Sequence, residues 1–285
     1  MPSRAADWLF ATIDIMAPRI AIPLPHSFDS EYAERAIPQY EHAVRVAGGE
    51  PVRIALDQSA EQTLRVMESC DGVLLPGSKA DVDPVRFRAV RSPHTAKADE
   101  RRDAVDDLLL GHAYQLRKPV LGICYGLQSL NVYRAGSLVQ HIPDFLPEEL
   151  RARVDHEAGK NVAVAHSVEI DSASELAKIV AAGPRSDAQG LVVIPVNSSH
   201  HQSADAIGEG LHIVARCAED GIVEALEGTA SDHFVLAVQW HPERSVDEDV
   251  PSRAIFAAFI RSASESASES ASDVARHQAT RKITS

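Results

Sequence analysis

The chain has 285 residues, of which 45% are hydrophobic, so it is long enough to bury one large core. Its formal net charge of -13 at pH 7 argues against nucleic acid or an anionic membrane surface as a partner. The three cysteines are widely spaced with no CxxC pair, which fits a reducing compartment and excludes a disulfide framework. No apolar run approaches the roughly 20 residues needed to span a bilayer, so we expect a cytoplasmic protein.

The N-terminus lacks the features of a targeting segment. Asp7 and Asp14 flank a short apolar stretch and interrupt the core that a signal peptide would need. Met16 stands just before the first convincing strand. We therefore expect residues 1–15 to be a dispensable extension and the folded domain to span residues 16–261.

Strand and helix alternate through the first half of the chain. Apolar runs predict buried strands at 19–23, 51–56, 71–75 and 119–123. Helical periodicity predicts helices at 60–68 and 99–116 and two further helices that end at Val46 and Arg134. Alternation at this pace is typical of an α/β fold with an open, mostly parallel, doubly wound sheet flanked by helices.

The second half has a different pattern. A short strand is predicted at 137–140, and longer strands at 162–170, 191–196, 211–217, 222–226 and 234–238. Because few helices separate them, we expect extra antiparallel strands in this half. A helix at 251–261 closes the domain, and the Ser-Ala-Ser-Glu repeats that follow predict a disordered tail at 262–285.

A cysteine lies at the junction of a predicted strand and helix. Cys124 follows the apolar run 119–123, with Gly122 and Gly126 two positions to either side. Small residues relieve crowding in a sharp strand-to-helix turn, and the helix N-terminus favours the thiolate form of the sulfur. A buried core cysteine at the end of a strand fits the same spacing, so the motif alone leaves both interpretations open.

A thiolate nucleophile needs a base and a group that orients this base. His241 and Glu243 follow the last predicted strand and are two positions apart, so both side chains face the same space in extended chain. The carboxyl ends of strands are where open α/β sheets bind ligands. The alternative is a surface histidine beside a solvated carboxylate.

Other polar residues follow the predicted strands. The turn at Gly77 and Ser78 and the amide of Tyr125 could supply oxyanion donors, although a Pro-Gly turn is also common without function. The cluster 197–202 contains adjacent histidines that face opposite ways, so we expect no metal site there. The chain has no P-loop and no HExxH motif, and no cofactor is expected.

Together these motifs resemble the class I glutamine amidotransferase superfamily, and within it the γ-glutamyl-γ-aminobutyrate hydrolase branch. The segments that carry the resemblance lie in a consistent order between about Arg19 and Arg261: Leu75–Ser78, Asp81–Pro84, Arg102–Asp103, Gly122–Gln128, Asn131–Val132, Val196–Gln202 and Gln239–Glu243. Three features differ from the usual pattern of this branch: Ser78 in place of a glycine, Tyr125 after the cysteine, and the amino-acid sequence of residues 87–95.

The resemblance implies a cysteine hydrolase that cleaves a γ-glutamyl amide through a thioester. Cys124 would be the nucleophile, His241 the base and acid, and Glu243 the residue that orients the imidazole. A small γ-glutamyl compound would be the substrate, and the resemblance implies that five residues contact it: Gln128, Ser199, His200, His201 and Gln202.

Two other functions are compatible with the sequence. The chain could be a glutaminase subunit that passes ammonia to a separate synthetase, which would then be a partner protein. It could also be a non-catalytic binding protein that has kept the fold. Neither the leaving amine nor the oligomeric state, with a homodimer as one alternative, follows from the sequence.

Overall fold

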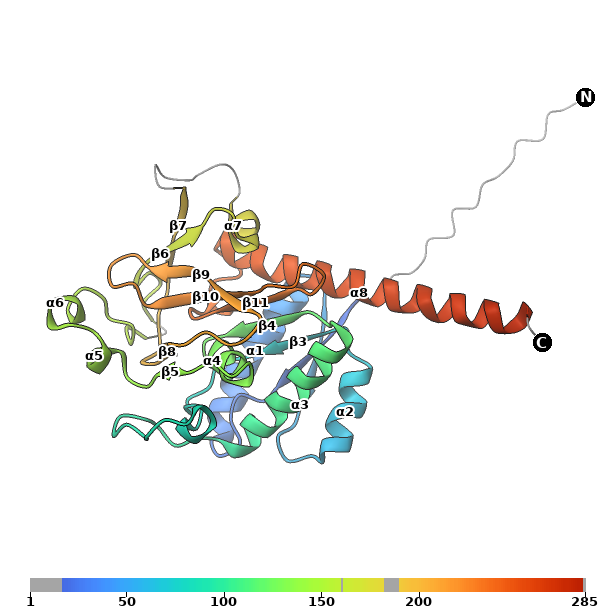
Figure 1. Cartoon of the computed structure of the whole chain (residues 1–285), viewed down its shortest axis with the longest axis horizontal. Coiled ribbons are helices and arrows are strands. Elements are labelled where there is room, and N and C mark those ends of the chain that lie inside the picture. The colour runs from blue at the N-terminus through green and yellow to red at the C-terminus, as the bar shows by residue number, and fades with distance from the viewer. Residues whose placement is uncertain (1–16, 160, 182–189, 284–285) are drawn as a thin grey trace, which may run out of the picture.

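A computed structural model describes residues 17–159, 161–181 and 190–283, with side chains through residue 268 (Figure 1). Its main sheet has nine strands in the order β2-β1-β3-β4-β11-β10-β9-β6-β7. Neighbouring strands pair in parallel in the first five: β2 (Glu50–Ile54), β1 (Arg19–Pro23), β3 (Gly72–Leu75), β4 (Val120–Ile123) and β11 (Val235–Val238). The expected N-terminal extension at 1–15 lies outside the described residues.

The other strands are antiparallel. They are β10 (Val223–Gly228), β9 (Leu211–Cys217), β6 (His166–Asp171) and β7 (Leu191–Val196), and a separate two-stranded sheet joins β5 (Leu138–Val139) to β8 (Ser203–Ala204). The predicted α/β class, with a mostly parallel sheet and extra antiparallel strands, is therefore confirmed.

Helices cover both faces of the main sheet. One face carries α1 (Ser30–Val46), α7 (Glu175–Val180) and α8 (Val250–Ile283), and the other carries α2 (Ala60–Glu68), α3 (Glu100–Leu116) and α4 (Tyr125–Tyr133). The alternation of each strand explains this division: Ile20 and Ile22 of β1 pack with α1 and α8, whereas Ala21 between them packs with α2 and α3. Four shorter segments complete the fold: η1 (Pro84–Phe87), α5 (Ile142–Phe145), α6 (Glu148–Arg151) and η2 (Pro242–Arg244).

The C-terminal segment differs from the prediction. Residues after Arg261 were expected to be disordered, but α8 continues as a helix to Ile283 and extends past the sheet (Figure 1). No glycine or proline follows Pro251, and alanine and glutamate are strong helix formers. Ser264 and Ser268 satisfy their hydroxyls by donating to carbonyls four residues back. Among the described residues, no helix is both long and apolar enough to cross a membrane.

The register of the central strands fixes the place of the site. β4 lies between β3 and β11, with Gly122 opposite Leu75 and Ile123 opposite Val238. The residues that follow these three strands therefore meet at one edge of the sheet, where open α/β sheets bind ligands. Cys124 stands in the middle of this edge.

Candidate active site

Cys124 occupies a strained turn between β4 and α4. Its backbone angles, φ 54° and ψ -105°, lie in a region that side-chain-bearing residues rarely adopt. A Cβ on Gly122 would lie 2.9 Å from the Gly126 carbonyl, so the turn closes only because both positions are glycine. The Cys124 amide donates to the Val238 carbonyl at 2.8 Å, which ties the turn to β11. The fold therefore holds the thiol in one position despite the backbone strain.

The His241 side chain lies between Cys124 and a buried carboxylate. Its Nδ1 is 2.7 Å from Glu243 Oε1, and the Cys124 side chain hydrogen-bonds to the same imidazole. Asn197 fixes the backbone of His241 by donating to its carbonyl at 2.9 Å and accepting from its amide at 3.0 Å. The structure thus brings together Cys124, His241 and Glu243, the three predicted residues, which come from two distant segments of the chain.

Charge interactions keep this histidine protonated. Burial opposes a charged imidazole, but the Glu243 carboxylate and the Cys124 side chain outweigh it and raise the pKa of His241 to about 9. Burial likewise opposes the Glu243 carboxylate, yet His241 holds the pKa of Glu243 below its ordinary value. At neutral pH the imidazolium is therefore the stable form, and it can donate a proton to a leaving group.

The three predicted oxyanion donors differ in their surroundings. Gly77 lies beside the site, since a Cβ there would be 3.0 Å from His241 Cε1 and 3.6 Å from Cys124 Cβ. Its amide, however, donates to the Tyr40 hydroxyl at 3.0 Å and is not free for a substrate, which corrects the expectation for Gly77. Within the described part of the chain, the amides of Ser78 and Tyr125 have no partner and stay the candidate donors.

A buried arginine supports the turn that carries Ser78. The Arg102 guanidinium is fully buried, donates to the Pro76 carbonyl at 2.8 Å and pairs with Asp106 at 2.7 Å. It also lies over the Tyr125 ring, whose hydroxyl donates to Asp103 at 2.6 Å. In the sequence, Arg102 and Asp103 stand out only through the resemblance to the family. Their supporting role depends on tertiary contacts, which cannot be recognised from the spacing of residues along the sequence.

A cavity opens over the cysteine. Its walls include Cys124, His241 and Glu243 and the five predicted substrate contacts, namely Gln128, Ser199, His200, His201 and Gln202. Only Ser199 and His201 of these five are partly exposed. The others are buried, and each has a partner: Gln128 donates to the Gln202 carbonyl, His200 faces the same carbonyl, and the Gln202 amide donates to the Gln140 carbonyl. Because they are partly exposed, Ser199 and His201 are better placed to touch a ligand, although the His201 ring also contacts Asp81 at 3.1 Å.

The cavity also contains positive charges that were not predicted for the site. Arg35, Lys79 and Arg244 line it, and Lys79 pairs with Asp29 at 3.0 Å. The Nη1 of Arg244 is buried and has no hydrogen-bond partner among the described residues. Arg244 directly follows Glu243, so its position next to the predicted motif could have indicated that it belongs to the site.

The chain is similar to several known proteins. Residues 20–243 match the Peptidase C26 family. A γ-glutamyl-γ-aminobutyrate hydrolase of Escherichia coli K12 is 33% identical over 227 residues, covering 78% of this chain and 84% of that protein. A protein of Rickettsia prowazekii, described only as glutamine amidotransferase-like, is 32% identical over 259 residues, covering 79% of this chain and 87% of its own.

Solved structures show the same fold at lower identity. The glutaminase domain of Trypanosoma brucei CTPS with bound acivicin aligns with a TM-score of 0.55 at 18% identity, over 87% of this chain and 94% of that one. PurLQS of Thermotoga maritima aligns with a TM-score of 0.53 at 17% identity, over 86% and 99%. Given the match over most of its length, the chain belongs to the Peptidase C26 family and has the glutamine amidotransferase-like fold.

Proposed function

We propose that the protein is a cysteine-dependent hydrolase of the γ-glutamyl amide bond in small γ-glutamyl compounds. The observation that carries the proposal is the arrangement around His241, which contacts the Cys124 side chain and has Glu243 2.7 Å from its other ring nitrogen. This is the arrangement that nucleophilic catalysis requires: a nucleophile, a base and an orienting carboxylate.

In the proposed reaction, Cys124 sulfur attacks the γ-carbonyl carbon and an oxyanion forms beside the amides of Ser78 and Tyr125. The C–N bond then breaks, and the amine leaves with a proton from His241. A water molecule gives its proton to the neutral His241 and attacks the thioester, which releases glutamate and restores the sulfur. The buried Arg244 Nη1 is a suitable partner for the carboxylate of the γ-glutamyl group.

The relatives support two versions of this chemistry. The E. coli relative is named a hydrolase of a γ-glutamyl amide, which favours a free-standing enzyme. The R. prowazekii relative is described as amidotransferase-like, and one structural neighbour is a glutaminase domain. The second candidate function is therefore a glutaminase that delivers ammonia to a separate synthetase.

A substrate panel distinguishes the two. The purified protein is offered glutamine, γ-glutamyl-γ-aminobutyrate and other γ-glutamyl amines, and glutamate release is measured. We expect turnover of γ-glutamyl amines without any added protein. Turnover of glutamine alone, and only when a synthetase is present, would support the glutaminase instead. Absence of turnover together with an unreactive Cys124 would contradict both and leave the non-catalytic alternative.

Glu243→Gln is expected to lower kcat/KM by about 10²- to 10⁴-fold. Without the carboxylate, burial dominates and the pKa of His241 falls from about 9, so the imidazolium is lost at lower pH. The basic limb of the pH profile of kcat/KM should therefore move to lower pH. Glu248→Gln is the control, because that carboxylate is exposed on the same loop. An unshifted profile in Glu243→Gln would show that this carboxylate does not act on His241.

A further inference from the structure

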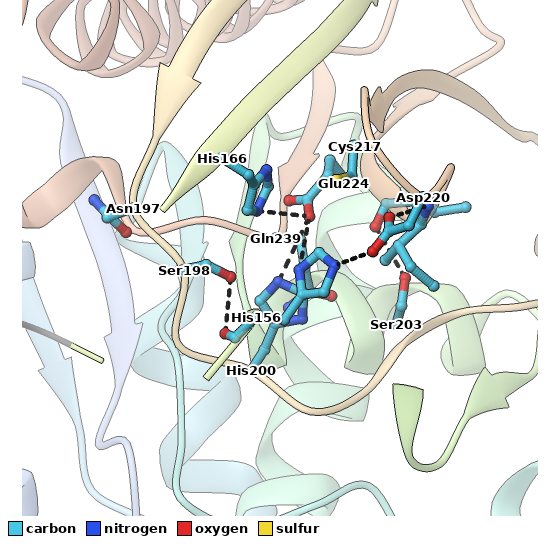
Figure 2. A network of polar contacts seen from close by, with 12 residues as sticks. His156, His166, Asn197, Ser198, His200, Ser203, Cys217, Asp220, Glu224 and Gln239 are labelled. Atoms are coloured by element: carbon cyan, nitrogen blue, oxygen red, sulfur yellow. Dashed lines mark hydrogen bonds and ion pairs between the residues drawn. The ribbon is translucent and has the colours of Figure 1, made fainter. Parts of the chain in front are cut away.

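Four buried side chains converge at a place that the proposed reaction does not use (Figure 2). His156 comes from the loop after α6, His166 from β6, His200 from the loop after β7, and Glu224 from β10. One ligand atom from each lies within 4.8 Å of the others. The side chains are between 0 and 4% exposed, so water does not solvate this cluster.

Each histidine uses its outer ring nitrogen for a hydrogen bond. The partners are Asp220 Oδ2 for His156 Nε2 at 2.9 Å, the Gln202 carbonyl for His200 Nδ1 at 2.9 Å, and the Ser167 carbonyl for His166 Nδ1 at 3.3 Å. Carboxylates and carbonyls only accept hydrogen bonds, so each ring places its proton on that outer nitrogen. In the neutral form of each ring, the inner nitrogen consequently presents a lone pair to the centre of the cluster.

The inner nitrogens of the three histidines face the Glu224 carboxyl group. The three inner nitrogens lie 3.4 to 3.6 Å from Glu224 Oε1. Neither these nitrogens nor the Glu224 oxygens have a hydrogen-bond partner among the described residues. Lone pairs and a carboxylate facing one another in a dry interior are costly unless a cation lies between them.

We propose that this cluster binds one divalent transition-metal ion of the zinc class through His156 Nδ1, His166 Nε2, His200 Nε2 and Glu224 Oε1. In a tetrahedral site with bonds of about 2.0 Å, neighbouring ligand atoms are roughly 3.3 Å apart. The separations of 3.4 to 3.6 Å from Glu224 Oε1 are close to this value. Imidazole ligands select zinc-like ions over calcium and magnesium, which prefer oxygen.

The surroundings of the cluster fit a metal centre. The contact of His156 with Asp220 is the carboxylate–histidine arrangement that orients metal-binding imidazoles in proteins. His156 and His200 also line a cavity beside α5 and α6, which gives an ion a path from solvent. Four protein ligands complete a tetrahedral shell, so the site would be structural and leave no position for a substrate.

The metal would act on the active site through the loop 197–202. This loop carries both His200, a proposed ligand, and Asn197, which holds the backbone of His241. Binding would thus connect the loop to β6 and β10 and fix the position of the catalytic histidine. This role differs from the predicted one, in which His200 contacts substrate and no metal is expected.

Elemental analysis of untagged full-length protein tests the proposal directly. We expect about one equivalent of a transition metal per chain. Metal-free protein prepared with a chelator should develop the visible spectrum of tetrahedral cobalt when it is titrated with Co²⁺. Chelation should lower the melting temperature and Zn²⁺ should restore it. These readouts do not depend on turnover, so they stand apart from the proposed hydrolase activity.

Variants separate this cluster from adventitious binding. Glu224→Gln and His166→Gln should lose the metal, and Asp220→Asn should weaken Zn²⁺ affinity by about 10- to 100-fold in a chelator competition. The double variant His94→Gln and His141→Gln is the control, because it removes a second histidine group that is largely exposed. The proposal is overturned if folded wild-type protein takes up neither Zn²⁺ nor Co²⁺, or if only the control variant loses metal. In that case, protons shared between the histidines and Glu224 would stabilise the cluster without a metal ion.

Discussion

Cys124→Ala is expected to reduce glutamate release from γ-glutamyl amides by roughly 10⁴- to 10⁶-fold. The sulfur is the atom that forms the thioester, and no other described side chain in the cavity is a thiol that could replace it. The change to alanine removes only the sulfur atom and leaves the strained backbone of the turn as it is, so we expect the variant to fold. Circular dichroism and steady-state kinetics on the same preparation measure both properties.

The other two cysteines provide matched controls. Burial raises the pKa of Cys70 to about 11 and raises that of Cys217 further, so both stay as unreactive thiols at neutral pH. Cys70→Ala and Cys217→Ala should retain turnover, and iodoacetamide should label Cys124 alone in the wild type. Substantial turnover in Cys124→Ala would refute the thioester mechanism. Labelling of Cys70 or Cys217 in preference to Cys124 would count against an activated thiol in the turn.

The parallel half of the fold could be predicted well because its strands are buried on both faces. Such strands appear as short apolar runs between turn residues, and the predicted first strand, 19–23, has the same bounds as β1. The turn at Cys124 could be recognised because steric crowding there limits Gly122 and Gly126 to glycine. His241 and Glu243 could be paired because they are two positions apart, which is a local property, although Glu243 lies in the short helix η2 and not in the extended chain that the prediction assumed.

The features that escaped prediction depend on contacts between distant segments. The amide of Gly77 has a partner only because α1 brings the Tyr40 hydroxyl to it. His156, His166 and Glu224 come from segments with no shared motif, and α7 is only six residues long, too short for a periodic signal. The tail was assigned from low hydrophobicity, whereas its alanine and glutamate content favours the observed helix.

Gly126→Ala is expected to destabilise the protein by about 3 kcal/mol and to impair catalysis as well. A Cβ at this position would lie 2.8 Å from Leu75 Cβ and closer still to the Leu75 carbonyl oxygen. Leu75 ends β3, which is paired on both sides with β1 and β4, so its backbone cannot move aside and α4 must shift instead. A shift of about 1 Å in α4 displaces Cys124 from His241, and misplacement of that size can cost about 100-fold in rate.

Gly111→Ala is the matched control, since Gly111 lies inside α3 and a Cβ there would meet only the Tyr133 hydroxyl, at 3.6 Å. This substitution should stabilise the helix by about 0.5 to 1 kcal/mol, because alanine loses less backbone entropy than glycine. Denaturant unfolding of both variants measures the two effects on one scale. Equal stability of Gly126→Ala and wild type would mean that α4 packs on β3 less closely than described. The strain at Cys124 would then lack the support that holds the thiol at the edge of the sheet.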